Sequence, residues 1–154
     1  MITVKYENLL NFTEDAVGQG CNCFSNMCAG VALALKNTYP EIFETDKNSL
    51  LKPVEKLGNF TKGILKKNGK TFYNIYSQFD FGINKVYLNY QALEKSLTAV
   101  LKDMKLNNLK SLALPKIGCG LAGGEWDKVL KILEKIDKMF DSKIKIVIYH
   151  LKKK

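Results

Sequence analysis

Hydrophobic residues recur along this chain in two patterns, at intervals of three and four positions and in short continuous runs. The first pattern predicts amphipathic helices over residues 87–106 and 125–139, and a shorter helix over 30–38 that ends before Pro40. The predicted core face of the first helix holds Leu93, Leu97, Val100, Leu101 and Met104. The core face of the second holds Trp126, Val129, Leu130, Leu133 and Ile136, and the short helix places Val31, Ala34 and Leu35 on one face.

The short apolar runs predict strands over residues 2–6, 15–20, 111–115 and 144–151. Residues 57–78 indicate two further strands joined at Asn68-Gly69, a residue pair typical of hairpin turns. Strands therefore alternate with helices along the chain. We expect one α/β domain over residues 1–154, with a mixed sheet and helices on both of its faces.

The net charge of +9 comes from lysine, because all 24 basic residues are Lys and none is Arg. Arg is the usual side chain for reading guanine edges and for clamping phosphate. We therefore expect no sequence-specific nucleic-acid partner, and phosphate contacts made by backbone N–H groups or Lys. No apolar run approaches the roughly 20 residues of a membrane span, and no signal segment precedes the first strand. We expect a cytoplasmic monomer with no membrane partner, in the host cytoplasm if the chain is viral.

The cysteines cluster in QGCNCFSNMCAG, residues 19–30, which holds Cys21, Cys23 and Cys28, while Cys119 lies apart. Their C-x-C-x4-C spacing differs from the C-x2-C pairs of common zinc sites, so we expect no metal. The interpretation we favour is that they are reduced, small residues packed in crowded loops. The one histidine, His150, lies in a C-terminal apolar run and is more typical of a structural residue, with a Cys–His catalytic pair as the alternative.

Two segments share the order strand, glycine-containing turn, helix: GQGCNCFSNMCAG at 18–30 and LPKIGCGLAGGEW at 114–126. In α/β sheets, ligands bind at such turns, outside the carboxyl ends of the strands. Helix N-termini attract anions, and glycine lets the backbone approach a phosphate closely. Two such loops facing each other would cradle a diphosphate without Arg. The alternative is that the glycines of the second segment serve only tight turns.

A family resemblance covers nearly the whole chain, through VKYENLL (4–10), GCNCFSNMCAGVALALKNTYP (20–40), YNIYSQFDFG (73–82) and LPKIGCGLAGGEW (114–126). In this order the segments resemble those of the macrodomains, which bind ADP-ribose. The chain is most similar to the branch with ADP-ribose-1″-phosphate phosphatases, phage relatives and terminal ADP-ribose glycohydrolases. The resemblance implies a single three-layer α/β/α domain with a mixed central sheet. It also implies ADP-ribose or a derivative as ligand, and no cofactor.

The resemblance also implies roles for individual residues. Asn8 matches the polar residue that contacts the adenine amino group, and Asn22 matches the asparagine that contacts the distal ribose. Residues 27–31 would surround the ribose and diphosphate, residues 117–121 would offer N–H groups to the phosphates, and residues 77–79 would line the distal ribose. The full implied binding set is Asn8, Leu9, Gly20, Asn22, Met27, Cys28, Ala29, Gly30, Val31, Ser77, Gln78, Phe79, Ile117, Gly118, Cys119, Gly120 and Leu121.

The chain departs from this branch at positions that carry catalysis. The glycohydrolases have a lysine where this chain has Gln78, and an acid where it has Ala122. The yeast-type phosphatase has a histidine where this chain has Gln19, which cannot act as an acid or base near neutral pH. The phage-like members share the motif TQ-aromatic-D, matched here by SQFD at 77–80. Asp80 is then the one carboxylate placed near the distal ribose.

Asn22, Gln78 and Asp80 form the candidate catalytic set. For Asp80 the alternative is a solvated turn residue beside Gly82. The function we expect is hydrolysis of ADP-ribose-1″-phosphate, or of a related ADP-ribosyl derivative. A non-catalytic ADP-ribose reader or sequestering protein is the first alternative, and a lysine-rich nucleic-acid-binding domain is the second.

Overall fold

A computed structural model describes residues 1–82 and 84–151, so residues 83 and 152–154 of the expected domain lie outside the described part. The described residues form a six-stranded sheet in the order β1-β6-β5-β2-β4-β3. Neighbouring strands are parallel except β3 and β4, so the expected mixed sheet is confirmed. The strands are β1 (Ile2–Lys5), β2 (Ala16–Cys21), β3 (Phe60–Ile64), β4 (Thr71–Tyr76), β5 (Ser111–Leu114) and β6 (Lys145–Tyr149).

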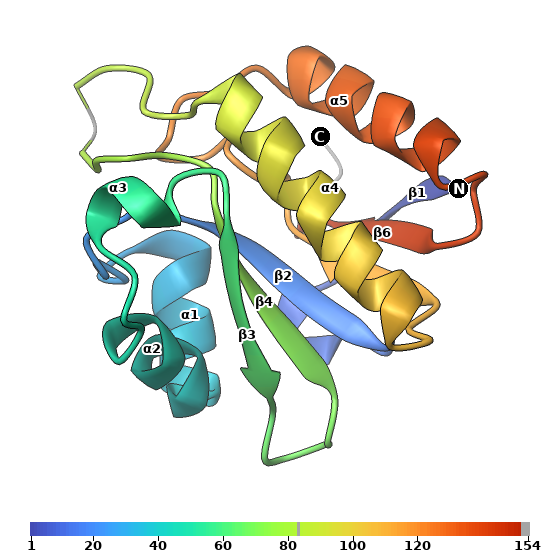
Figure 1. Ribbon diagram of the computed structural model, residues 1–154, viewed down its shortest axis with the longest axis horizontal. Helices are drawn as coiled ribbons and strands as arrows, with labels where there is room; N and C mark the ends of the chain where they lie inside the picture. Colours follow the sequence, from blue (N-terminus) through green and yellow to red (C-terminus); the bar gives the residue numbers. More distant parts are fainter. Residues whose placement is uncertain (83, 152–154) are drawn as a thin grey trace.

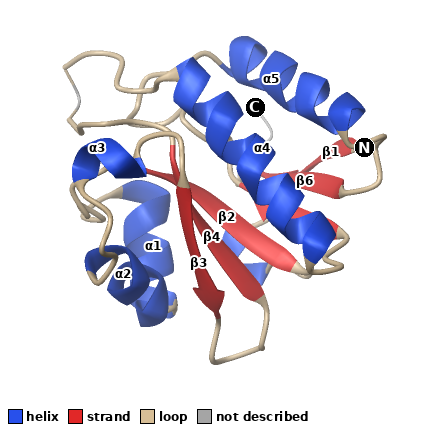
Figure 2. Cartoon of the chain, viewed as in Figure 1, coloured by secondary structure: helices blue, strands red, loops and turns tan. Residues whose placement is uncertain are grey.

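Helices cover both faces of this sheet, as expected. The long helices α4 (Tyr90–Leu106) and α5 (Trp126–Met139) lie side by side on one face, and α1 (Gly30–Thr38) and α2 (Pro40–Lys47) lie on the other (Figures 1 and 2). Two short helices complete the fold, the 3-10 helix η1 (Leu9–Asn11) and α3 (Pro53–Lys56). Among the described residues, no helix is both long enough and apolar enough to cross a membrane.

Two separate apolar cores fill the spaces between the sheet and its helices. The predicted face of α4 is confirmed, because Leu93, Leu97, Val100, Leu101 and Met104 are all buried in the first core. In α5, Val129, Leu133 and Ile136 are buried as predicted, whereas Trp126 and Leu130 are only partly buried. The second core lies under α1 and α2 and includes Leu35 and Ile42.

The hairpin between β3 and β4 turns where the sequence predicts it. Gly69 has a φ of 71°, a left-handed conformation that glycine adopts without strain. Its N–H donates to the Leu65 carbonyl at 2.8 Å, and the Leu65 N–H donates to the Lys70 carbonyl at 2.8 Å. The turn therefore places β3 antiparallel at the edge of the sheet.

Several predicted bounds are wrong. The helix predicted over 87–106 begins only at Tyr90, because Leu88 forms a bridge to Gln78 and Asn89 caps the helix with its side chain. Of the three residues predicted to share one face of the short helix, Leu35 is buried and Ala34 is partly buried, while Val31 in the open first turn of α1 is 43% exposed. The strands that begin and end the chain stop at Lys5 and Tyr149, short of their predicted ends at residues 6 and 151.

The sequence interpretation also missed helices α2 and α3. Pro40 follows the end of the preceding helix, as predicted. Proline is also common in the first turn of a helix, because the backbone N–H that it lacks would have no acceptor within the helix there. Pro40 opens α2 in this way, and Tyr39 caps both α1 and α2. Pro53 likewise opens α3.

Candidate ligand-binding loops

Three segments meet where neighbouring parallel strands end. The first loop (residues 22–29) follows β2, the connecting segment (77–82 and 84–89) follows β4, and the second loop (115–125) follows β5. Because β5, β2 and β4 are adjacent and parallel, their carboxyl ends lie at one edge, at the upper left of Figure 1.

Side chains at the ends of these strands touch one another. A Cβ placed on Gly20 would lie 2.9 Å from Ser77 Oγ and 3.0 Å from Ile117 Cγ1. Ser77 is fully buried, and its hydroxyl has no hydrogen-bond partner among the described residues. Buried hydroxyls normally have a partner, so Ser77 Oγ is a donor or acceptor in need of one. The expected grouping of the three segments is therefore present in the fold.

Asn22 holds the first loop together from within. Its Oδ1 accepts the N–H of Phe24 at 2.9 Å and that of Asn26 at 3.3 Å, while its amide donates to the Asn26 carbonyl at 2.8 Å. Asn26 in turn accepts the N–H of Cys28 at 3.3 Å. Asn and Asp side chains commonly replace backbone partners in such turns. Asn22 is buried, and its amide keeps one N–H that these contacts do not use.

The first loop also contacts the connecting segment, through hydrogen bonds and a pair of aromatic rings. The Cys23 N–H donates to the Phe79 carbonyl at 3.0 Å, and Cys23 Sγ contacts the Gln78 carbonyl at 3.3 Å. The rings of Phe24 and Phe79 meet edge to face, 5.0 Å apart. Both rings remain exposed, 46% for Phe24 and 38% for Phe79, which leaves an aromatic surface beside the loops.

The start of α1 is an open helix N-terminus. Its N-cap is Ala29, which makes no side-chain cap, although Ser, Thr, Asp and Asn are the residues that usually cap helices. The N–H groups of residues 30–32 therefore have no partner within the helix. Cys28, Ala29, Gly30 and Val31 are exposed here, whereas Met27 is buried in the core. This arrangement suits an anion.

The glycines of the second loop fall into two groups. Gly118 has a φ of 76°, and a Cβ there would lie 2.7 Å from Leu88. Gly123 has the same φ, and a Cβ on Gly124 would collide with Leu88 and the Gly118 carbonyl. The fold itself requires these three glycines. Gly120 differs, because a Cβ there meets nothing within 4 Å and its φ is not left-handed. Neither packing nor backbone conformation explains why this exposed position is glycine.

The second loop rests on the connecting segment through its backbone. The Ala122 carbonyl accepts the N–H of Tyr87 at 2.8 Å and that of Leu88 at 3.2 Å. Within the loop, the Gly124 N–H donates to the Gly118 carbonyl at 2.8 Å. Ile117 is buried beneath the loop, whereas Gly120 and Leu121 are exposed. The connecting segment thus joins both loops.

The candidate catalytic residues come from two segments that are in contact. Gln78 and Asp80 lie in the connecting segment, and Asn22 begins the first loop. Gln78 is partly buried, and its amide donates to the Asp80 carbonyl at 2.9 Å. Asp80 is exposed, and its Oδ1 accepts the Phe81 N–H at 2.8 Å. Asn22 connects to them through Cys23, its chain neighbour, which contacts Gln78. Asp80 is therefore a turn residue with a carboxylate open to solvent.

Gln19 points away from these residues. It is buried on the α1 and α2 side of the sheet, where its amide donates to Asn74 Oδ1 at 3.1 Å and approaches Met27 Sδ at 3.7 Å. Its oxygen is buried without a partner among the described residues. Gln19 therefore supports the first loop from below rather than facing a ligand.

Asn8 and Leu9 lie at the far end of the sheet edge, after β1. Asn8 is exposed and caps the short helix η1, with its Oδ1 accepting the Leu10 N–H at 3.0 Å. Leu9 is buried in the second core, with 7% of its surface exposed. The side-chain amide of Asn8 is available for a polar contact.

The cysteines have two different environments. Cys21 and Cys23 are buried, and burial raises the pKa of the Cys23 thiol to about 11. Burial likewise raises the pKa of the half-buried Cys119 thiol. Cys28 is exposed, so the expectation of packed cysteines is wrong at this position. No group of three or more His, Cys, Asp and Glu that could hold a metal occurs among the described residues.

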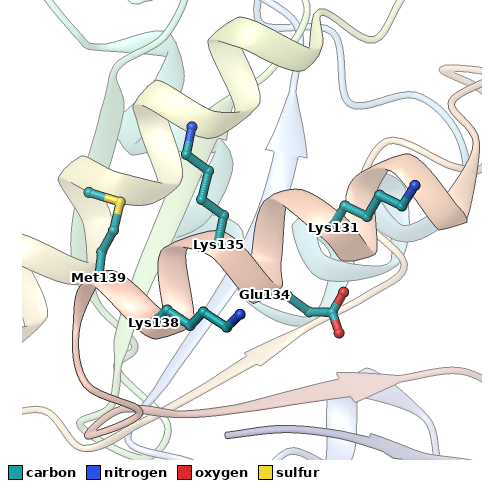
Figure 3. A pocket seen from close by; sticks show the side chains of 5 residues that line it. All are labelled: Lys131, Glu134, Lys135, Lys138 and Met139. Atoms are coloured by element: carbon teal, nitrogen blue, oxygen red, sulfur yellow. The ribbon is translucent and has the colours of Figure 1, made fainter.

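A surface hollow lies on α5, away from these loops. Figure 3 shows its lining, Lys131, Glu134, Lys135, Lys138 and Met139. The Lys135 side chain extends toward α4, where its ammonium pairs with Glu94 Oε2 at 2.8 Å. A second hollow lies between α4 and the start of α5. Both are shallow depressions between helix side chains and contain none of the predicted site residues.

Known proteins resemble this chain over most of its length. A family model described as Macro domain matches residues 84–133. An uncharacterized 17.5 kDa protein of Enterobacteria phage T4 is 34% identical, over 86% of this chain and 83% of the relative. The human ADP-ribose glycohydrolase OARD1 is 30% identical, over 84% of this chain and 80% of the relative. The chain belongs to the macrodomain family.

Solved structures agree with this assignment of the fold. The macrodomain of Mycobacterium tuberculosis DarG superposes with a TM-score of 0.78 at 24% identity, covering 97% of both chains. The expected three-layer macrodomain fold is thereby confirmed. The present chain has Gln78 and Ala122 at the two positions where the resemblance implies a lysine and an acid in the glycohydrolases. The Gln78 amide donates to the Asp80 carbonyl within its own turn, and Ala122 is buried.

The sequence interpretation missed a buried charged pair beside the first loop. Lys56 and Asp46 are 4% and 1% exposed, and Lys56 also reaches Ser25. Lysine is rarely buried, and nothing in LKPVEKLG distinguishes Lys56 from the surrounding surface lysines. A signal could have come only from knowing that α2 and α3 form.

Proposed function

We propose that this macrodomain binds ADP-ribose, with its diphosphate between the open start of α1 and the backbone of the second loop near Gly120. The observation that carries the proposal is the contrast among the loop glycines. Three are required by the fold, whereas Gly120 is exposed with open space around it. A glycine that the fold does not need is explained where a ligand approaches the backbone closely.

The absence of arginine agrees with this way of binding. Backbone N–H groups and a helix N-terminus supply fixed positive dipoles that need no charged side chain. Ser77, whose buried hydroxyl has no partner among the described residues, adds a further polar group below the loops. The human relative is named an ADP-ribose glycohydrolase, which supports the same ligand class.

We further propose that the protein hydrolyses ADP-ribose-1″-phosphate, or a related ADP-ribosyl derivative. Asp80 would accept a proton from the attacking water, whose oxygen forms a bond to phosphorus while the bond between phosphorus and the 1″-oxygen breaks. The proton taken up by Asp80 would then pass to the departing 1″-oxygen, which becomes a hydroxyl. The products would be ADP-ribose and phosphate. The exposed Asp80 carboxylate beside Gln78 supports this role, because a general base must reach a water molecule and the substrate.

A non-catalytic reader is the second candidate, and two residues favour it. Gln78 and Ala122 replace the lysine and the acid of the glycohydrolase branch, and neither side chain can transfer protons or form an imine. A protein with these replacements and an intact binding surface would sequester ADP-ribose without turnover.

Calorimetry and a turnover assay separate these candidates. We expect ADP-ribose to bind at least tenfold more tightly than AMP, because AMP lacks the diphosphate bridge and the distal ribose; this is the order of one or two hydrogen bonds to charged groups. We expect Asp80→Ala to retain binding and to lower phosphate release from ADP-ribose-1″-phosphate by about 10²–10⁴-fold. Equal affinity for AMP would contradict the diphosphate site. Binding without turnover in the wild type would establish the reader.

A further inference from the structure

A buried ion pair joins the helices α2 and α3 beneath the first loop. Lys56 Nζ lies 2.7 Å from Asp46 Oδ1, and the two side chains are 5% and 1% exposed. The same carboxylate oxygen accepts the Tyr76 hydroxyl at 2.6 Å. Removing charges from water is unfavourable unless they are paired and hydrogen-bonded. The pair therefore holds α2, α3 and the end of β4 in one arrangement.

The ammonium of Lys56 has all of its hydrogen bonds satisfied. Its three N–H donors match three acceptors: Asp46 Oδ1, the Asp46 carbonyl at 3.1 Å and Ser25 Oγ at 3.2 Å. A lysine acts as a nucleophile only through a free amine. Because each donor is engaged and the pair is buried, Lys56 is no substitute for the catalytic lysine that is absent at Gln78.

The contact with Ser25 reaches the middle of the first loop. Ser25 has a φ of 56°, in the left-handed region that residues other than Gly, Asn and Asp rarely adopt. It lies between Asn22 and Asn26, whose mutual hydrogen bonds close the turn. The hydroxyl of Ser25 is therefore held from below at the residue where the loop backbone reverses.

We propose that Lys56 is a positioning residue, which fixes the first loop in its ligand-binding conformation through Ser25, with Asp46 fixing Lys56 in turn. The proposal rests on the proposed ADP-ribose function for its role in binding. A loop that becomes ordered only when a ligand binds loses conformational entropy, which weakens the affinity. A loop that is already ordered in the free protein avoids this loss and binds the ligand more tightly. The Asp46–Lys56 pair supplies that order through the hydrogen bond from Lys56 to Ser25.

The first test removes only the Ser25 hydroxyl. In Ser25→Ala we expect ADP-ribose affinity to fall about tenfold, the size of one hydrogen bond to a charged group. Amide hydrogen exchange in the ligand-free protein should become faster at residues 23–28, with the exchange of the sheet and of α4 unchanged. This exchange pattern distinguishes loop positioning from a general loss of stability.

The second test replaces the pair without leaving a buried charge. Lys56→Met alone would strand the Asp46 carboxylate, so it is combined with Asp46→Asn. We expect the double variant to fold and to reproduce the faster loop exchange and the weaker binding of Ser25→Ala. Lys62→Met is the matched control, because it breaks the Lys62–Asp103 pair between β3 and α4, remote from the loop. It should leave both readouts as in the wild type.

The outcomes separate this proposal from the proposed function. Unchanged loop exchange in Ser25→Ala and in the double variant would overturn the positioning role, whatever the affinity. Faster loop exchange with no ADP-ribose binding even in the wild type would retain the positioning of the loop and overturn the proposed ligand. Equal loss of affinity in Lys62→Met would show that any lost ion pair weakens binding, which also overturns the proposal.

Discussion

The first and second loops follow the same order of strand, loop and helix, but different interactions hold them in place. Side chains hold the first loop: Asn22 bonds its backbone from within, and Lys56 holds Ser25 from below. Glycine conformations hold the second, with Gly118 and Gly123 both at a φ of 76° and the backbone of Ala122 bonded to the connecting segment. Similar sequence patterns therefore do not imply similar sources of rigidity.

This difference determines which substitutions should disturb the conformation of each loop. Substituting a glycine in the second loop changes backbone conformation or fills space. In the first loop, substitutions should act mainly by removing hydrogen bonds. The one residue of this loop with a left-handed conformation is Ser25, which is not a glycine. The substitutions below separate the two modes.

The largest effect is expected at Gly120. Gly120→Glu places bulk and a negative charge where we propose that phosphate meets the backbone, so ADP-ribose binding should fall at least 100-fold by sterics and Coulomb repulsion. The melting temperature should change little, because a Cβ at this position meets nothing within 4 Å. Calorimetry and thermal unfolding measure the two effects. Gly120→Gln, with similar bulk and no charge, separates the two causes, and normal binding by Gly120→Glu would exclude the second loop as the phosphate site.

A smaller effect, on stability, is expected at Gly118. Gly118→Ala forces a side chain into a left-handed conformation and against Leu88, so unfolding free energy should fall by about 2–3 kcal/mol. Gly120→Ala is the matched substitution and should change it by less than about 0.5 kcal/mol, as at an exposed position with no special backbone conformation. Urea titrations of both variants measure the difference. Equal costs would mean that the two glycines do not differ structurally.

A smaller loss of stability than at Gly118 is expected in the first loop, at Asn22. Asn22→Ala removes the acceptor of the Phe24 and Asn26 N–H groups, which should lower unfolding free energy by about 1–2 kcal/mol and weaken ADP-ribose binding. Asn22→Asp retains the oxygen that accepts these N–H groups but places a second, charged oxygen against the Asn26 carbonyl, so at neutral pH it should be at least as destabilising. Paired urea and calorimetric titrations test this. A stability loss below about 0.5 kcal/mol in Asn22→Ala would show that these hydrogen bonds do not order the first loop.

Much of the fold is predictable from local pattern. The spacing of Leu93, Leu97, Val100 and Leu101 predicts the buried face of α4, because a helix that packs on a sheet must be apolar on one side. The pair Asn68-Gly69 predicts its turn for a similarly local reason. Helix α2 was missed because Pro40 is a stop signal for α1 as well as a start signal for the helix after it.

The candidate site is predictable only in part. Parallel strands imply that residues 20, 77 and 117 lie at one edge, and the structure has them in contact. The four loop glycines look alike in sequence. Contacts with Leu88, the left-handed φ of Gly118 and the close approach of Gly124 to the Gly118 carbonyl distinguish these two from Gly120. The spacing of Val31, Ala34 and Leu35 predicts that they share one helix face, but only the structure shows that Leu35 is buried and Val31 exposed.

The sequence by itself determined the alternation of strands and helices, the two glycine loops and the family motifs, because each depends on neighbouring residues along the chain. Only the tertiary structure decided which polar groups are buried and what they bond. Lys56 is one lysine among 24 basic residues in the sequence. It becomes a buried partner of Asp46 and Ser25 because α2, α3 and the first loop converge on one point. Such convergence arises from packing between segments distant in sequence, which local pattern does not encode.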